Sequence, residues 1–188
     1  MICFEKVCFS YPGKEIFKDL SLEFPDQGTI ALMGPSGMGK TTLLRLLAGL
    51  EKPASGQIKG SGQKKISFLF QEDRLLPWLT AKKNVALAAD EEKAAYWLSQ
   101  MEIENAAQSP LEMSGGMQRR VALARAMAYE GDILLLDEPF KGLDESLRAR
   151  IAGRIREKAA LTVLSIHDRT EAALMGAEIW ELNEVLGK

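Results

Sequence analysis

Apolar and polar side chains alternate along this chain with two periods, one typical of strands and one typical of helices. Residues 2–9 and 20–24 alternate apolar and polar positions, which predicts half-buried strands, and the segment YPGKE predicts a turn between them. Short, mostly apolar runs predict buried strands elsewhere. These runs lie at 29–33, 66–70, 132–139 and 161–168, and a last strand is predicted at 178–182.

Between these strands the apolar positions recur at helical spacing. We expect helices at 40–50, from about 84 to 108, and at 117–130, 145–160 and 170–177. In the helix at 145–160, Leu147, Ile151 and Ile155 form one apolar stripe that a core would bury. A loop is expected at 51–56, and a short edge strand followed by a turn at 58–65. Strands that alternate with helices predict a mostly parallel sheet with helices on both faces.

The composition is ordinary for a globular protein, with 46% hydrophobic and 27% charged residues among 188. The net charge of −2 argues against a nucleic-acid-binding protein. Cys3 and Cys8 are five positions apart, so on a regular strand they would point to opposite faces and could not form a disulfide. Free thiols fit a reducing cytoplasm. We expect neither a secretion signal nor a membrane span, so any contact with a membrane runs through a partner.

The segment GPSGMGKTT at residues 34–42 is a complete phosphate-binding loop. Its glycines let consecutive backbone N–H groups point at a polyphosphate, Lys40 adds a mobile ammonium group, and Thr41 adds a hydroxyl suited to Mg²⁺. The loop lies between a predicted strand and a predicted helix, whose N-terminus carries a partial positive charge. The sequence therefore predicts a nucleotide polyphosphate as the ligand.

Two carboxylates end the buried strand ILLLDEP. Charges at the end of a buried strand are costly unless they are used, and parallel sheets bind ligands at the carboxyl ends of their strands. We therefore expect Asp137 to hold Mg²⁺, directly or through water, and Glu138 to accept a proton from an attacking water. The alternative is two ordinary surface acids.

A second predicted anion site is the start of the helix after Met113. Ser114, Gly115 and Gly116 precede a strong helix and combine a serine cap with exposed N–H donors. Taken alone, this segment is better explained as a plain helix cap. One nucleotide needs only one phosphate-binding loop, so a second anion site in the same chain must have a different role.

Together these segments resemble the ATP-binding cassette ATPases. The order of SGG, QRRVALARA and LLLDEP carries the resemblance, with GLD at 142–144 and a lone His167 after a strand. The resemblance covers nearly the whole chain. It implies ATP hydrolysis with Mg²⁺, and an ATP-dependent homodimer in which each SGG segment closes on the ATP held by the other subunit.

The fold class we predict is α/β: a P-loop NTPase core with a mostly parallel sheet flanked by helices, a small antiparallel β subdomain and a short inserted helical subdomain. We expect a single domain over residues 1–188. Its core takes in about 1–73 and 114–188. The helical subdomain takes in about 74–113, where the alternation gives way to helix alone.

The resemblance also implies roles for single residues. Tyr11 matches the aromatic residue that stacks on adenine. The other ATP-binding positions match Gly34, Pro35, Ser36, Gly37, Met38, Gly39, Lys40, Thr41 and Thr42. The metal positions match Thr41, Gln71 and Asp137, and the catalytic positions match Glu138, His167, Gln71 and Lys40. The signature offered in trans matches Ser114, Gly115, Gly116, Met117 and Gln118, and the loop at the dimer interface matches Asp144.

The chain departs from the family pattern at several positions. Met113 and Met117 stand where the signature usually has Leu and Gln, and the loop that usually reads Ser-Ala-Leu-Asp begins here with Lys141 and Gly142. The second departure puts the contacts of the dimer interface in doubt, and Asp144 itself is kept. We expect no C-terminal regulatory domain, because few residues follow His167.

The segment QEDRLLPWLTAKKNVALA is similar to the corresponding stretch of importers for nitrate, sulfonates, taurine and thiamine precursors. This implies transmembrane permease subunits as partners, a solute-binding protein in the same system, and a cytoplasmic location on the inner face of the cell membrane. The apolar cluster Leu75–Leu79 would receive a helix of the permease, or would simply pack in the core. Three alternatives stay open: an exporter subunit, a soluble P-loop kinase, and a regulatory module that binds ATP without turnover.

Overall fold

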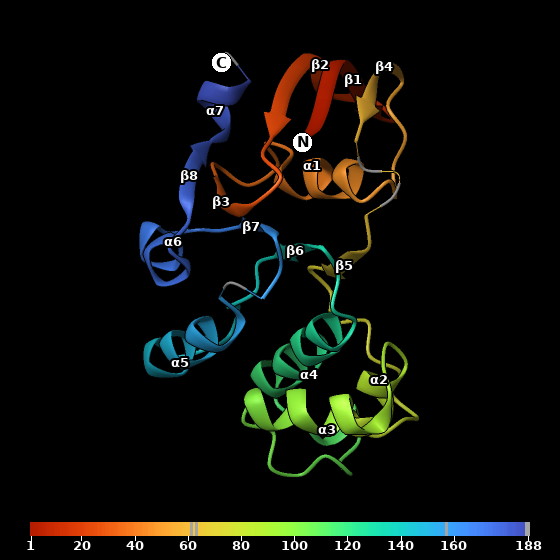
Figure 1. Ribbon diagram of the computed structural model, residues 1–188, viewed down its shortest axis with the longest axis vertical. Coiled ribbons are helices and arrows are strands. Elements are labelled where there is room, and N and C mark those ends of the chain that lie inside the picture. The colour runs from red at the N-terminus through yellow and green to blue at the C-terminus, as the bar shows by residue number, and fades with distance from the viewer. Residues whose placement is uncertain (61, 63, 157, 187–188) are drawn as a thin grey trace.

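The computed structural model describes residues 1–60, 62, 64–156 and 158–186. Figure 1 shows the antiparallel strands near both chain ends, the parallel strands in the middle, and helices α2 and α3 at the opposite end. The parallel sheet has five strands in the order β5-β6-β7-β3-β8. Its strands are β3 (Gly28–Met33), β5 (Ile66–Leu69), β6 (Ile133–Asp137), β7 (Leu161–Ser165) and β8 (Glu178–Glu181). The predicted α/β fold and its parallel sheet are confirmed.

Successive residues of the parallel strands face two different cores, as a period of two requires. On β6, Ile133 and Leu135 pack in one core, and Leu134 and Leu136 pack in the other. The first core holds α1 (Lys40–Leu47) and the antiparallel sheet. The second core holds α4 (Gly115–Ala128), α5 (Glu145–Ile155) and α6 (Arg169–Met175). Both faces of the sheet are therefore buried, and only strand ends are free for chemistry.

The antiparallel sheet has the order β2-β1-β4, formed by β1 (Ile2–Tyr11), β2 (Lys14–Phe24) and β4 (Ser55–Lys59). Strand β1 contains an irregularity around Lys6, whose φ is +48°. The extra residue shifts the alternation, so Phe4 and Val7 are both buried. The expectation that Cys3 and Cys8 point to opposite faces is therefore wrong, because both lie on the half-exposed face. Both thiols are free.

The helical regions differ from the sequence prediction mainly at their ends. The helix predicted from 84 to 108 is two short helices, α2 (Ala81–Ala86) and α3 (Glu91–Gln100), because Asp90 caps a new helix by accepting from the backbone N–H of Lys93. Helix α4 begins at Gly115, two residues early, because Ser114 caps it. Helix α5 ends at Ile155, and its predicted stretch to 160 includes residue 157, outside the described residues.

Two short helical segments complete the described chain. They are a 3₁₀ turn, η1 (Pro110–Glu112), and α7 (Leu182–Val185), and neither was predicted. The predicted turn at 58–65 includes residues 61 and 63, which lie outside the described residues. The predicted apolar stripe on α5 is confirmed, since Ile151 and Ile155 are fully buried and Leu147 packs against the same core.

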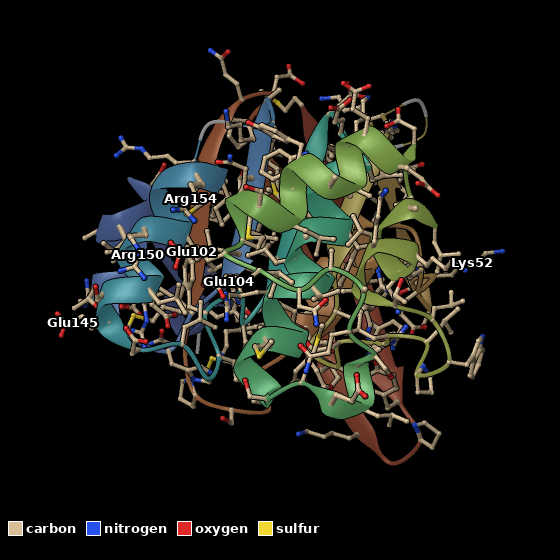
Figure 2. All side chains as sticks on the ribbon, turned by 90° about the horizontal axis from the view of Figure 1, so that it is seen from below. Lys52, Glu102, Glu104, Glu145, Arg150 and Arg154 are labelled. Atoms are coloured by element: carbon tan, nitrogen blue, oxygen red, sulfur yellow. The ribbon has the colours of Figure 1, made fainter. Side chains whose placement is uncertain are left out.

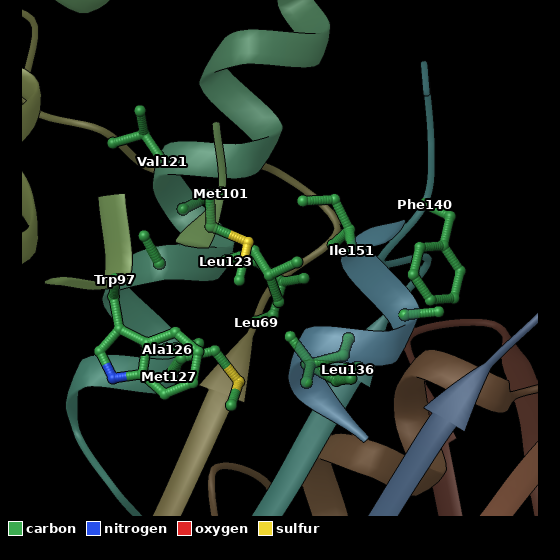
Figure 3. Packing of buried hydrophobic residues seen from close by; sticks show 14 of the residues in the cluster. Leu69, Trp97, Met101, Val121, Leu123, Ala126, Met127, Leu136, Phe140 and Ile151 are labelled. Carbon is green, nitrogen blue, oxygen red and sulfur yellow. The ribbon is translucent and has the colours of Figure 1, made fainter. Parts of the chain in front are cut away.

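Helices α2 and α3 pack on α4, and the core of this region is continuous with the core of the sheet. Figure 3 shows Trp97 and Met101 beside Val121, Leu123 and Met127, with Leu69 and Leu136 of the sheet next to them. A movement of α2 and α3 would therefore be transmitted to α4. Across the part of the chain that the structure describes, none of the helices has the length and apolarity that crossing a bilayer requires.

Candidate functional site

The phosphate-binding loop joins the end of β3 to the start of α1. Gly39 has a φ of +110°, in the left-handed region that favours glycine. A Cβ placed there would lie 2.8 Å from Ile16 Cγ2 and 2.8 Å from Phe17 Cζ. The loop therefore rests directly on β2, which holds its curve in place. Thr41 and Thr42 follow in the first turn of α1.

Lys40 is buried inside this loop, with 7% of its surface exposed. Its ammonium group donates to the carbonyl oxygens of Gly34 and, at 3.2 Å, Pro35. Burial lowers the pKa of Lys40, and the nearby carboxylates of Glu138 and Asp137 partly offset that effect. A phosphate group would give this ammonium group a stronger partner than two neutral carbonyl groups.

Lys14, which the sequence analysis missed, also reaches the loop. Its Nζ donates to the carbonyl oxygen of Gly37 at 3.3 Å, and it lines the same pocket as Lys40. The turn at Pro12 and Gly13 brings it there from the start of β2. Its only signal in the sequence is its closeness to Tyr11, because a lysine after a turn is usually a solvated residue.

Asp137 and Glu138 follow each other at the carboxyl end of β6. Asp137 is 1% exposed, and its Oδ1 accepts a hydrogen bond of 2.7 Å from Ser165 Oγ. Its Oδ2 is buried and has no hydrogen-bond partner. A buried carboxylate oxygen without a partner is costly, so this atom is suited to a cation.

The carboxylate of Glu138 contacts three other side chains. Its Oε1 lies 2.9 Å from His167 Nε2 and accepts a hydrogen bond of 3.3 Å from Gln71 Nε2. Lys141 Nζ lies 3.8 Å from its Oε2. Glu138 has a φ of +52°, in a region that residues other than glycine seldom adopt and that is often found at functional sites. This backbone turn aims the carboxylate at the loop that carries Gln71.

His167 lies at the end of β7, next to the carboxyl end of β6. Its backbone N–H donates to Glu171 Oε2 at 3.4 Å. Burial raises the pKa of Glu171, which is 7% exposed. The side chain of His167 is 53% exposed, so a ligand can reach it.

Most of the predicted site residues line one pocket of about 280 Å³. The predicted residues along its wall are Tyr11, Ser36, Gly37, Gly39, Lys40, Thr41, Thr42, Gln71, Asp137, Glu138 and His167. The ring of Tyr11 contacts Phe9 edge to face, with centroids 5.0 Å apart. A larger, shallow hollow of about 950 Å³ lies over the half-exposed face of the antiparallel sheet, away from all of these residues.

The predicted signature residues and Asp144 do not line this pocket. Ser114 caps α4 by accepting from the N–H of Met117, and Gln118 donates to the carbonyl oxygens of Pro110 and Met113. Asp144 caps α5 by accepting from the N–H of Leu147 at 2.9 Å. Within one subunit these residues therefore have local structural roles. A single copy does not bring them to the phosphate-binding loop.

The signature segment and the loop at 141–144 touch each other. A Cβ on Gly116 would lie 2.9 Å from the carbonyl oxygen of Gly142. Gly142 itself has a φ of +76°. The glycine that departs from the family pattern thus fits the local backbone, which takes a left-handed turn at that position.

The donor set fits a small divalent cation that keeps several waters. Among the described residues no group of three or more His, Cys, Asp or Glu side chains could hold a metal by itself. The pocket instead offers Asp137 Oδ2, the hydroxyl of Thr41 and the side-chain oxygen of Gln71. Mg²⁺ typically binds through one or two carboxylates plus substrate phosphates, so these residues fit it better than they fit zinc.

Two buried residues of the site were also missed by the sequence analysis. Ser165 donates to Asp137 Oδ1 and accepts from the backbone N–H of Glu138 at 2.9 Å. Arg119 donates to the carbonyl oxygens of Asp137 and Glu138. The only sign of Ser165 in the sequence is its place in an apolar run. Nothing in the pair Arg119-Arg120 indicates which arginine is buried.

Residues 17–141 match the family model described as ABC transporter. The chain is 40% identical over 184 residues to an aliphatic sulfonates import ATP-binding protein of Delftia acidovorans, covering 93% of this chain and 76% of that protein. It is 38% identical over 201 residues to a probable sulfate/thiosulfate import ATP-binding protein of Chlorella vulgaris, covering 95% of this chain and 85% of that protein.

A solved structure with a similar fold is a dimeric, post-hydrolysis state of the ATP-binding cassette MJ0796 bound to ADP and Pi. The TM-score is 0.83 with 28% sequence identity, and the match covers 93% of this chain and 91% of that chain. These similarities extend over more than nine-tenths of the chain.

Proposed function

Because this chain belongs to the ABC transporter family and is an ATPase, we propose that its hydrolysis of ATP drives the import of a small solute. One observation carries the assignment of the site. Glu138, His167 and Gln71 come together at one carboxylate oxygen, in the pocket that also holds Lys40 and Asp137. A carboxylate, an imidazole and an amide next to a phosphate-binding loop are suited to activating water beside a terminal phosphate.

In this proposal the chain's own residues carry out the hydrolysis. The backbone N–H groups of residues 36–42 and the ammonium group of Lys40 bind the phosphates. Gln71 and His167 orient the attacking water, and Glu138 takes its proton as the new bond to the terminal phosphorus forms. The bond from that phosphorus to the bridging oxygen breaks, which leaves ADP and phosphate. Tyr11 stacks on the base at the other end of the pocket.

Asp137, Thr41 and Gln71 would hold Mg²⁺ in this pocket. When bound, the ion would neutralise charge that develops on the phosphate oxygens. The unpartnered Oδ2 of Asp137 supports this assignment, because a cation would satisfy it. Ser165 keeps the other oxygen, Oδ1, occupied.

The complete site is proposed to form between two copies of the chain. Residues 114–118 and Asp144 lie outside the pocket of their own subunit, which supports a role toward a second copy. The solved relative MJ0796 is a dimer. The start of α4 at Ser114 would bring N–H donors and a positive helix end to the terminal phosphate of the partner's nucleotide.

The permease is proposed to dock on the subdomain at about 74–113, next to the core formed by about 1–73 and 114–188. Trp78 is 76% exposed, while its neighbours Leu75, Leu76 and Pro77 are half-buried. A large exposed apolar side chain supports a contact with another protein. This contact would hold the subunit at the inner face of the cell membrane, on the cytoplasmic side.

The cargo is proposed to be a small oxyanion of the sulfonate or sulfate kind. Two relatives that match over most of their length are named for the import of aliphatic sulfonates and of sulfate or thiosulfate. A solute-binding protein would deliver the cargo to the permease. The relatives' names favour import over export, and the SGG segment at the start of α4 has no use in a soluble kinase.

The experiment that tests the site is ATP hydrolysis by the variant Glu138→Gln. A positioned base contributes about 10²–10⁴ in rate, so release of phosphate should fall at least about 100-fold while ATP still binds. Lys158→Gln, a surface change away from the pocket, is the control and should hydrolyse like the wild type. Hydrolysis by Glu138→Gln near the wild-type rate would remove Glu138 from this role. Transfer of phosphate to an acceptor without free phosphate would point to a kinase.

A further inference from the structure

Arg119 is a buried arginine that has no part in the proposed binding of nucleotide or Mg²⁺. It lies in α4, five residues after the cap Ser114, and is 2% exposed. Its guanidinium group lies between α4, the loop after β5 and the turn after β6. The guanidinium of arginine carries five donors in a fixed plane, so it can hold several acceptors at once.

One side of the guanidinium group holds the backbone on either side of Glu138's α-carbon. Nη2 donates to the carbonyl oxygen of Asp137 and, at 2.9 Å, to that of Glu138. Nε donates to the same Glu138 carbonyl at 3.2 Å. Both carbonyl groups that bracket the left-handed residue are therefore fixed by one side chain.

The other side of the group holds the loop that carries Gln71. Nη1 donates to the carbonyl oxygen of Phe70 at 2.6 Å and to Asp73 Oδ1 at 2.8 Å. Asp73 is half-buried, so this ion pair is partly shielded from water. Gln71 lies between these two anchor points, and its side chain reaches Glu138.

Ser165, at the end of β7, also holds Asp137 and Glu138. Its Oγ accepts the N–H of Glu138 at 2.9 Å and donates to Asp137 Oδ1 at 2.7 Å. The N–H and the carbonyl group of Glu138 are thus both held by buried side chains. A residue with a φ of +52° is strained, and such strain persists only where the surroundings determine the backbone fully.

We infer that Arg119 is a positioning residue that fixes Glu138 and the loop carrying Gln71 relative to each other. Ser165 has the same role toward the backbone N–H of Glu138. This inference rests on the proposed role of Glu138 as the base. Because Arg119 belongs to the helix that begins with the signature, it also ties the position of that helix to the geometry of the base. A displacement of about 1 Å at a reacting group can cost about 100-fold in rate, so loss of this support should act on the chemical step.

The test is a set of variants assayed for the kcat and KM of ATP hydrolysis. Arg119→Met should lower kcat by about 10- to 100-fold and leave KM within about twofold, because the phosphate-binding loop is untouched. Arg119→Gln keeps an amide N–H₂ group that can donate toward one of the two segments. Its kcat should therefore lie between those of Arg119→Met and the wild type. Ser165→Ala, a smaller change in a buried strand, should show the same split between kcat and KM and covers the case in which Arg119→Met does not fold.

Arg125→Met is the matched control. Arg125 lies on the same helix and donates to the carbonyl oxygens of Asp73 and Arg74, but no bond joins it to Glu138 among the hydrogen bonds of the described residues. It should lower the melting temperature and leave kcat within about twofold. A purely structural role for Arg119 predicts the same result for both arginine variants, and that result would overturn the inference.

A second readout separates this inference from the proposed function. In the Glu138→Gln background, adding Arg119→Met should leave the Kd for ATP unchanged, because the phosphate-binding loop is untouched. If Glu138→Gln fails to hydrolyse ATP while Arg119→Met and Ser165→Ala keep the wild-type kcat, the inference falls and the proposed function stands. If Glu138→Gln hydrolyses normally, the proposed function falls first.

Discussion

At the scale of single residues, the proposed function divides the pocket's residues into those that bind the nucleotide and those that act on it. Tyr11, Glu138 and His167 all line this pocket, and we propose that Tyr11 stacks on the base while Glu138 and His167 act at the terminal phosphate. Substitution of a binding residue should change the affinity for ATP, and substitution of an acting residue should change the rate of the chemical step.

The variant Tyr11→Ala tests the first half of this separation. Aromatic stacking is worth about 0.5–1.5 kcal/mol, so the Kd for ATP should rise roughly 2- to 10-fold with kcat almost unchanged. Tyr129→Ala is a suitable control, because Tyr129 packs under Lys65 away from the pocket. Titration with a fluorescent ATP analogue measures both variants. Equal Kd values for Tyr11→Ala and the wild type would exclude stacking at this position.

Gly39 tests the packing of the phosphate-binding loop on β2. Gly39→Ala puts a methyl group 2.8 Å from Ile16 Cγ2 at a φ of +110°, and should lower the free energy of unfolding by about 1–3 kcal/mol. Gly153→Ala in α5 meets no atom within 4 Å and should raise it by about 0.5–1 kcal/mol. Urea denaturation measures both. A stable Gly39→Ala protein would show that the loop is free to move off β2.

The spacing of residues along the chain predicted most of the side chains that line the pocket. It did not predict the residues whose role depends on contacts with distant parts of the chain. Lys40 and Asp137 could be predicted because a loop and a strand end fix them locally. Arg119 and Ser165 could not, because their partners lie 18 to 49 residues away along the chain. Cys3 and Cys8 were assigned to opposite faces because a single extra residue at Lys6 left no mark on the pattern.

At the scale of elements, one ion-pair cluster joins the region of α3 to α5. Glu102, just after α3, accepts from Arg150 Nε at 2.8 Å and lies 2.8 Å from Arg154 Nη2 (Figure 2). Hydrogen bonding to Arg150, with help from Arg154, lowers the pKa of Glu102 to about 2. The folded pKa is below the unfolded value, so the stabilisation is complete above the unfolded pKa and is lost as the pH falls toward 2.

The variant Glu102→Gln should therefore be less stable than the wild type by about 1 kcal/mol at neutral pH. The difference should shrink as the pH falls from about 5 to about 3, and also as salt is added, because part of the pair is exposed. Denaturant unfolding across this pH range measures it. Lys93→Gln, which breaks a more exposed pair with Glu130, is the control and should have a smaller effect. A difference that does not change with pH would contradict the assignment.

The elements themselves were predicted better than their ends. Buried strands and amphipathic helices follow from periodicity, and the parallel order follows from their alternation. The break at Asp90 and the early start of α4 depend on caps that the periodicity does not report. The predicted cap at Ser114 is confirmed, whereas a lone aspartate such as Asp90 is also common in ordinary loops.

At the scale of the whole molecule, each proposed active site is shared between two copies of the chain. A single subunit has a complete phosphate-binding loop, but its Ser114–Gln118 segment lies outside that pocket. No periodicity or spacing could have predicted this, because the contact belongs to a pair of molecules. The resemblance to cassette ATPases suggested it, and the dimeric solved relative supports it.

The most direct test is the mass in solution of the Glu138→Gln variant, measured by light scattering with and without ATP and Mg²⁺. We predict twice the subunit mass with ATP and the subunit mass without it, because trapped ATP would bridge the two copies. Adding Ser114→Arg, which blocks the signature and leaves the phosphate-binding loop intact, should return the protein to the subunit mass while ATP still binds. A variant that binds ATP fully yet stays at the subunit mass would contradict the shared site.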